Sequence, residues 1–226
     1  MQIMKQLSIK GLFLPAIGLC SLLLSGNAAH AAPVTYSFEG AVSEVTGVLF
    51  PTLNSGHTMT GNITFDVGAA PIAPLGTNIY LNSITGLDLH IGSYNAMQAP
   101  GADGIILTNN APGGIDNITT FASMSSGTLI NGTSPTMFDV SLTDPNGNVF
   151  SNLGSWVDGP TAPPSLNSFA SNKWRLTFGD GNFVLGSLTK LQAVPLPAAV
   201  ILFGAGLISL VGLGAGGLRN LRWPQA

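Results

Sequence analysis

The chain has 226 residues, of which 7 are basic and 10 acidic, so its net charge is −3 and only 8% of its residues are charged. Proteins hold nucleic acids mainly by placing lysine and arginine against phosphates, so this composition excludes a nucleic-acid partner. Hydrophobic residues make up 45% of the chain. Two long apolar segments, one near each end, contribute strongly to that share.

The first segment has the three parts of a secretory signal peptide. Two lysines precede an apolar run over residues 11–24, and Ala-His-Ala at 29–31 is the small-residue pattern that signal peptidase cleaves. We predict a signal peptide over residues 1–31; an uncleaved anchor helix is the alternative. The single cysteine, Cys20, lies inside this segment, so we expect no disulfide and no thiolate metal site in the exported part.

Residues 32–193 are expected to form one exported domain. They contain 3 basic and 10 acidic residues, a net charge of −7, and their length suits a single core. Apolar and polar residues alternate most clearly over residues 59–67, which places Met59, Ile63 and Phe65 on one face of a strand. The same alternation predicts strands near residues 34–39, 87–91, 138–142 and 173–178. Turn residues separate these runs, so we predict an all-β ectodomain with a β-sandwich or jelly-roll-like fold.

Two stretches, residues 92–117 and 154–171, are rich in glycine and proline and are expected to be loops. Long loops on a β-scaffold often carry binding residues. Tyr94 and Trp156 are therefore candidate glycan-binding residues, because a flat aromatic ring among polar neighbours can stack on a sugar. The alternative is that Trp156 folds over one end of the core.

The exported part contains no sequence motif of a known catalytic site. The nucleophile elbow, the zinc-protease helix, the phosphate loop and the dinucleotide fingerprint are all absent from the sequence. His57 and His90 are expected to be surface histidines. A glycoside hydrolase would need two carboxylates about 5–9 Å apart in one cleft. The acidic residues that could supply such a pair are Asp103, Asp116, Asp158 and Asp180, and each is explained equally well as a turn residue.

Residues 144–149 combine a turn signal with a partial metal motif. Asp144, Asn146 and Asn148 have the spacing that opens a calcium loop, but Val149 and Ser155 stand where that loop needs a glycine and a carboxylate. We therefore predict a hairpin turn at Asn-Gly 146–147, no metal site and no cofactor.

The C-terminal segment has the features of a membrane-spanning signal. An apolar run over residues 198–218 is long enough to cross roughly 30 Å of hydrocarbon as a helix, and a basic tail over residues 219–226 follows it. Arg219 and Arg222 are expected to stay on the cytoplasmic side, which leaves the ectodomain outside the inner membrane. The motif that precedes the helix comprises Val194, Pro195, Leu196, Pro197, Ala198 and Ala199.

The order of proline pair, apolar helix and arginines over residues 194–226 resembles the PEP-CTERM sorting signal. That signal belongs to bacteria that make exopolysaccharide, and an exosortase, a membrane cysteine-type transpeptidase or protease, recognises it. Leu196 stands where the name-giving pattern has glutamate, as in a Val-Pro-Leu-Pro-Ala-Ala variant. Residues 35–40 and 61–66 also resemble the first two strands of other proteins that carry this signal, most of which have no assigned activity.

The resemblance implies where the protein travels and which enzymes handle it. Signal peptidase and an exosortase would process a chain that the C-terminal helix holds briefly in the membrane. We expect an exported cell-surface or exopolysaccharide-matrix protein with a structural or interaction role and no enzymatic activity, in contact with extracellular polysaccharide. The alternatives are a carbohydrate-binding or glycan-hydrolysing secreted protein, and a permanent membrane anchor that is never cut.

Overall fold

The computed structural model describes residues 33–66, 71–72, 76–126, 128–150 and 164–195, together with positions 203 and 206. These residues lie in the second of two compact units, which begins at Pro33. The predicted signal peptide and the sorting motif from Leu196 onward lie outside the described residues. Within the described part of the chain, no helix is both long and apolar enough to span a membrane.

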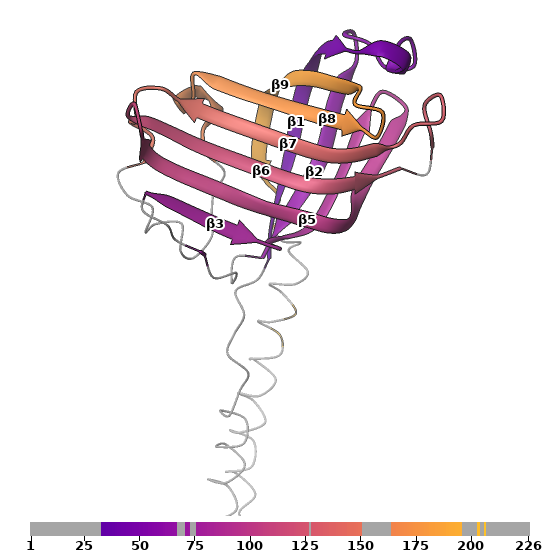
Figure 1. The fold of residues 1–226 in the computed structure, drawn as a ribbon. Coiled ribbons are helices and arrows are strands. Elements are labelled where there is room, and N and C mark those ends of the chain that lie inside the picture. The colour runs from indigo at the N-terminus through magenta and orange to yellow at the C-terminus, as the bar shows by residue number, and fades with distance from the viewer. Residues whose placement is uncertain are drawn as a thin grey trace, which may run out of the picture. The chain divides into compact units, whose positions relative to one another are not determined.

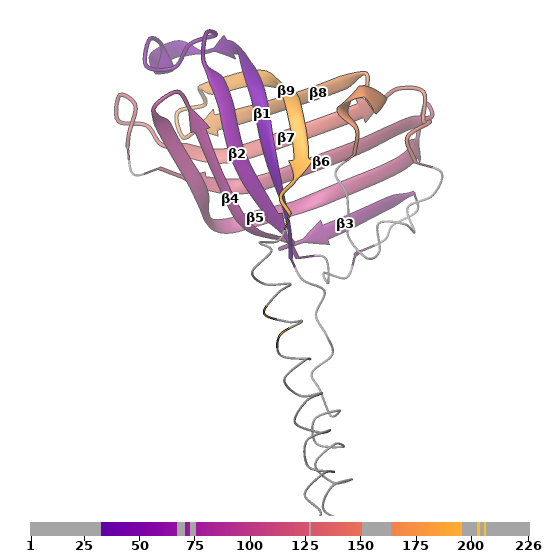
Figure 2. The ribbon, with the colours of Figure 1, turned by 180° about the vertical axis from the view of Figure 1, so that it is seen from behind.

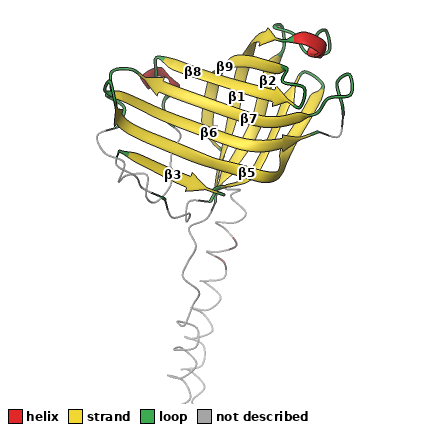
Figure 3. Cartoon of the chain, viewed as in Figure 1, coloured by secondary structure: helices red, strands yellow, loops and turns green. Residues whose placement is uncertain are grey.

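Nearly all of the described domain is β-structure, which confirms the all-β prediction (Figures 1 and 3). Two short 3-10 helices, η1 (Gly47–Leu49) and η3 (Leu166–Ser168), interrupt the strands. The strands are β1 (Val34–Val45), β2 (Thr58–Phe65), β3 (Thr77–Leu81), β4 (Ile84–Ile91), β5 (Tyr94–Ala111), β6 (Ile115–Ser125), β7 (Pro135–Asp144), β8 (Ser171–Phe178) and β9 (Phe183–Ala193).

The strands form one antiparallel sheet that closes on itself. The order β5-β4-β2-β1-β9-β8-β7-β6 returns to its start, because β6 also pairs with β5. β3 lies outside this eight-stranded barrel and pairs with the second half of β5. β5 to β8 run across one side, while β1, β2 and β4 cross behind them (Figures 1 and 2). The architecture therefore differs from the expected sandwich, in which two separate sheets would face each other.

The length of β5 explains how the sheet closes. Its 18 residues pair with β4 at the beginning, with β3 further along and with β6 on the other edge. The pairing with β6 is irregular between Gln98 and Asp103, where β5 passes from one side of the barrel to the other. Residues 92–117 were expected to be a loop, but most of them form β5 and the start of β6, and only the turns at 92–93 and 112–114 remain.

The core consists of the inward faces of the alternating strands. In β2, Met59, Ile63 and Phe65 are buried, as their alternation predicts. Phe138 lies between the rings of Phe38 and Trp174, with centroid distances of 5.8 and 6.3 Å. Such stacked and tilted aromatic pairs add to the stabilisation from burial.

Candidate functional site

The first and last strands of the described domain are neighbours in the barrel wall, so the chain enters and leaves the barrel at the same place. The first strand, β1, and the last strand, β9, are antiparallel neighbours, and Tyr36 pairs with Ala193. One further hydrogen bond continues the pairing, because the backbone N–H of Val194 donates to the carbonyl oxygen of Thr35 at 2.8 Å. The chain therefore enters the sheet after Pro33 and leaves it at Pro195, from the same end of the domain (Figure 2).

Local chemistry explains why the sheet ends where it does. Pro33 and Pro195 have no N–H to donate, so neither can extend the ladder as a normal strand residue would. Between them, the outer face of the strand pair is polar, and Lys190 forms an ion pair of 2.9 Å with Glu39. Both side chains are more than 40% exposed, so this ion pair contributes little to stability. The backbone ladder and the buried face hold β9 in place.

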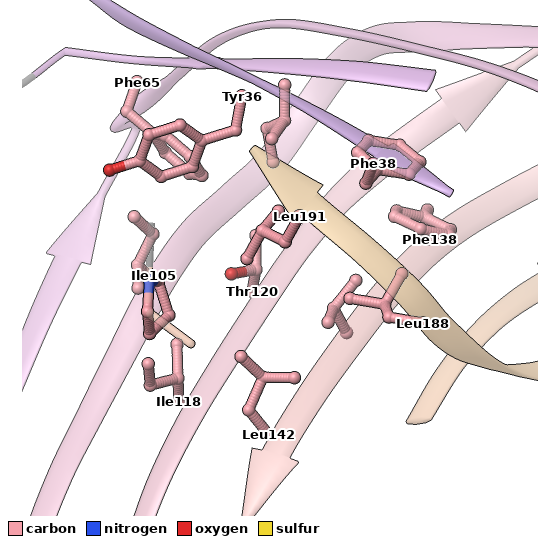
Figure 4. Close-up of a pocket in the computed structure, with 13 residues that line it drawn as sticks. Tyr36, Phe38, Phe65, Ile105, Ile118, Thr120, Phe138, Leu142, Leu188 and Leu191 are labelled. Carbon is pink, nitrogen blue, oxygen red and sulfur yellow. The ribbon is translucent and has the colours of Figure 1, made fainter. Parts of the chain in front are cut away.

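Beneath β9 the barrel contains an apolar cavity of about 50 Å³ (Figure 4). Phe38, Phe65 and Leu191 are among the residues that line it, and of the lining residues that the structure describes, Tyr36 and Thr120 are the polar ones. Burial raises the pKa of the Tyr36 hydroxyl far above its ordinary value, so this phenol stays neutral. The cavity has room for a few water molecules or methyl groups, and its described lining offers few polar partners for a sugar.

The structure corrects the assignment of Tyr94 as a glycan-binding residue. Its side chain is only 4% exposed and packs against Phe178, with the ring centroids 5.9 Å apart. Burial raises the pKa of its hydroxyl, and the side chain of Ser126 partly offsets that increase. A ring enclosed in this way has no free face for a sugar. Trp156, the other candidate, lies outside the described residues.

Two of the candidate catalytic carboxylates, Asp103 and Asp116, lie far apart. Asp103 is opposite Ala122 in β6, whereas Asp116 is six positions earlier in the same strand. At the rise of a strand, this separation is about 20 Å, well beyond the spacing of a glycosidase pair. Asp103 instead accepts a hydrogen bond from the backbone N–H of Ile84 at 2.9 Å.

The other two candidates, Asp158 and Asp180, supply no pair that the structure describes. Asp180 lies in the turn between β8 and β9 and binds Asn182, whose side-chain amide lowers the pKa of the carboxyl. Asp158 lies outside the described residues. Within the part of the chain that the structure covers, no three His, Cys, Asp or Glu side chains come close enough to hold a metal ion.

The contacts of the buried Asp116 could not be predicted from the sequence. This residue is fully buried at the start of β6 and pairs in register with Asp144 at the end of β7. Its carboxylate accepts hydrogen bonds from the backbone N–H groups of Asn110 at 3.0 Å, Val149 at 2.9 Å and Phe150 at 2.7 Å. The contacts with Val149 and Phe150 link segments more than 30 residues apart, so no local sequence pattern indicates them.

Asp144 organises the turn that follows β7. Its two carboxylate oxygens accept hydrogen bonds from the backbone N–H groups of Asn146 at 3.0 Å and Asn148 at 2.9 Å, and these bonds lower the pKa of the carboxyl. The chain turns over residues 144–147, where the N–H of Gly147 donates to the carbonyl oxygen of Asp144 at 3.4 Å. The predicted hairpin at 146–147 is wrong, because Val149 does not begin a second strand. Its N–H, which a hairpin would use in the ladder, is held by Asp116.

The histidines lie where the sequence analysis expects them, in a turn and on a polar strand face. His57 is in the turn before β2, near the Asn54 side chain at 3.4 Å. His90 is on the outer face of β4, half-exposed and 3.7 Å from Asp88. The side chains that hydrogen-bond or ion-pair with these histidines in the described part of the chain are those of Asn54, Asp88 and Asn95, and none of them is a hydroxyl or thiol nucleophile.

Comparison with known proteins finds no family model, no curated protein and no solved structure that matches the chain. The sequence motifs and the geometry of the described residues are therefore the features that point to a function. The strand pair β1 and β9 connects the sequence motifs with the fold, because the predicted sorting motif begins at Val194, where that pair ends.

Proposed function

We propose that this protein is an exported cell-surface or exopolysaccharide-matrix protein whose C-terminal signal is processed by an exosortase, and that its role is structural rather than enzymatic. The observation that supports this most directly is the position of the motif. Val194 is both the first residue of the motif and the last residue in the β1–β9 ladder. The motif thus begins where the folded domain ends.

The arrangement of the ends is compatible with processing at both of them. Every described strand lies between Val34 and Ala193. Removal of residues 1–31 and of the segment beyond the motif would therefore break no described strand pairing. A domain built in this way keeps its barrel before and after processing, as a protein that is anchored first and released or re-attached later requires.

The hydrogen bonds of two carboxylates support a structural role over an enzymatic one. Asp103 and Asp116 accept backbone hydrogen bonds, and their oxygens hold loops in place. Among the described residues that line the apolar cavity, few offer the polar groups that glycan binding requires. The alternative function in glycan binding or hydrolysis keeps Trp156 as its candidate residue.

The test is to express the full chain in a bacterium that contains the processing transpeptidase and in a strain that lacks it. We expect mass spectrometry to find an N-terminus at Ala32 in both strains. In the strain with the transpeptidase, we expect a C-terminus within residues 194–199 and protein at the surface or in the medium. Without the transpeptidase, the chain should keep Ala226 and remain in the membrane fraction. Retention of Ala226 in both strains would refute the proposal and indicate a permanent anchor.

A further inference from the structure

An open groove lies between β4 and β5, where β5 passes from one neighbouring strand to the next. β4 pairs with β5 only as far as Met97, and β3 takes over the same edge of β5 from Gly104 onward (Figure 2). On the other edge of β5, the pairing with β6 is interrupted over the same stretch, between Gln98 and Asp103. Residues 99–102 therefore have no ladder partners on either edge in the described sheet, and the groove forms beside them.

Two side chains of β5 bridge the gap to β4 in place of a backbone ladder. The side-chain amide of Gln98 donates a hydrogen bond to the carbonyl oxygen of Ile84 at 2.8 Å. The N–H of Ile84 donates to Oδ1 of Asp103 at 2.9 Å. Because these bonds occupy both backbone groups of Ile84, an extended peptide cannot pair with that residue as an added strand would.

The groove has the size of a ligand-binding site. Its volume is about 480 Å³, and small-molecule sites in proteins have volumes of about 300–1,000 Å³. It is open to solvent rather than enclosed. An open groove can hold one stretch of a longer chain without enclosing the ends of that chain, so its shape suits a polymer.

The described lining of the groove combines an apolar part with hydrogen-bond acceptors. The apolar part includes Leu87, Pro100 and Met97, whose side chain is 59% exposed. The Asp103 carboxylate accepts the short hydrogen bond on Oδ1, while its Oδ2 has Gln98 Nε2 at 3.4 Å. A carboxylate has about four acceptor sites, so Asp103 retains capacity for further donors. No lysine or arginine is among the described residues that line the groove.

A neutral sugar matches this combination of groups. One face of a sugar ring carries C–H groups that can pack on apolar side chains, and the hydroxyl groups at its edge can donate to a carboxylate. An acidic sugar would place a second negative charge beside Asp103, with no cation in the described lining to balance it, on an exported part that is already acidic.

We infer that the β4–β5 groove binds a neutral polysaccharide, with Asp103 and Gln98 contacting its hydroxyl groups and Met97 its C–H face. This inference rests on the proposed function, because it names the chemical class of the extracellular polymer that the protein contacts. The groove is separate from the apolar cavity beneath β9, with which it shares no described lining residue.

The first measurement is binding of the purified full chain, kept in detergent, to an array of neutral and acidic oligosaccharides. We expect binding to at least one neutral glycan, weaker binding to acidic glycans of similar length, and no effect of EDTA. Binding to acidic glycans alone, binding to none, or binding that EDTA abolishes would overturn the inference. No processing enzyme takes part in this assay, so such a failure leaves the proposed processing standing. A chain that binds a neutral glycan but keeps Ala226 in cells would overturn the processing alone.

Two substitutions test whether the groove is the site, with affinity measured for the neutral polysaccharide that binds best. Asp103→Asn keeps the shape of the side chain but removes an acceptor for hydroxyl groups, so affinity should fall about tenfold or more. Met97→Ala removes exposed apolar surface and should weaken binding about threefold or more. Asp139→Asn and Met137→Ala are the matched controls, because both residues lie on β7, outside the described lining of the groove, and they should stay within about twofold of the wild type.

Circular dichroism shows whether each variant is folded, since Asp103 also binds the backbone of Ile84. If Asp103→Asn does not fold, Met97→Ala decides the result, because the Met97 side chain is largely exposed. A change of less than twofold in every groove variant that folds would overturn the inference.

Methionine oxidation locates the bound glycan directly in the unmodified sequence. Met97 is 59% exposed and Met137 is 38% exposed, so hydrogen peroxide should oxidise both sulfurs in the free protein. A saturating amount of the bound polysaccharide should slow oxidation of Met97 about threefold or more and leave that of Met137 unchanged, as measured by peptide mass spectrometry. Equal oxidation of Met97 with and without the polysaccharide would place the glycan elsewhere and overturn the inference.

Discussion

Replacement of the buried carboxylate at position 116 should destabilise the barrel more than replacement of any exposed acidic residue. Asp116 accepts three backbone N–H groups, one on Oδ1 and two on Oδ2. In Asp116→Asn the side chain keeps its shape, but one oxygen becomes an NH₂ group that can only donate. Either one or two of the three backbone donors then lose their acceptor inside the protein.

The magnitude follows from the cost of those lost bonds. Hydrogen bonds to a charged group contribute about 1.5–3 kcal/mol each, and a buried donor without a partner adds its own desolvation cost. Because the amide is cheaper to bury than the carboxylate, we expect the free energy of unfolding to fall by about 2–4 kcal/mol. In a domain of this size, that corresponds to a drop in Tm of about 4–16 °C.

The assay is urea or thermal denaturation of the processed protein, followed by far-UV circular dichroism. Asp139→Asn is the matched control, because Asp139 lies on the next strand and forms a partly exposed ion pair with Arg175 at 3.1 Å. The control should cost less than about 1 kcal/mol. If Asp116→Asn costs no more than Asp139→Asn, the three hydrogen bonds do not hold the turn after β7 as the structure indicates.

Three further changes test other contacts of the barrel. Hydrogen bonds lower the pKa of the Asp144 carboxyl, so its contribution to stability is present above its ordinary pKa of 3.8 and is lost as the pH falls through the lower folded-state pKa. The variant Asp144→Asn should therefore lose less stability than the wild type as the pH falls in acid denaturation. An unchanged pH profile would contradict this. Gly186→Ala should lower the free energy of unfolding in urea by at least about 1–3 kcal/mol, because the added Cβ would overlap the Trp174 ring. Gly86→Ala is the control and should cost much less, because its added Cβ would lie 3.7 Å from the nearest atom, in Thr64. Lys190→Ala should lower the free energy of unfolding by less than about 1 kcal/mol, and by less still at high salt, because both side chains of its ion pair are exposed. A larger loss in the same unfolding assay would show that the ion pair stabilises the domain more than an exposed pair should.

The strands that the sequence predicts correctly share one property. In residues 59–67, apolar and polar side chains alternate without interruption, and the structure buries Met59, Ile63 and Phe65 on one face of β2. Alternation of this kind is local, because each side chain in a strand points opposite to the one before it whatever the partner strand is. β5 breaks the pattern around Pro100 and Gly101, so its 18 residues were expected to be a loop.

The function of single polar and aromatic residues was harder to predict. Tyr94 has polar neighbours in the chain and was expected to face solvent, yet it packs on Phe178, which comes from the other side of the barrel. Asp116 was interpreted as a turn residue, yet its carboxylate binds backbone groups of residues 149 and 150. In both cases the decisive neighbour is far away in the sequence.

The sequence by itself determines the β-class of the domain, a turn after residue 144 and the features that predict an export signal and a sorting signal. Alternation, turn chemistry and apolar length are properties of neighbouring residues. Only the tertiary structure decides that the sheet closes through β5 and β6 and that Asp116 holds the turn after β7. It also places the first strand beside the last, so that Val194 is the end of the ladder. The contacts of Asp116 with residues 149 and 150 and the bond between Val194 and Thr35 join residues 33 to 159 positions apart. They depend on how the whole chain packs its apolar faces into one core.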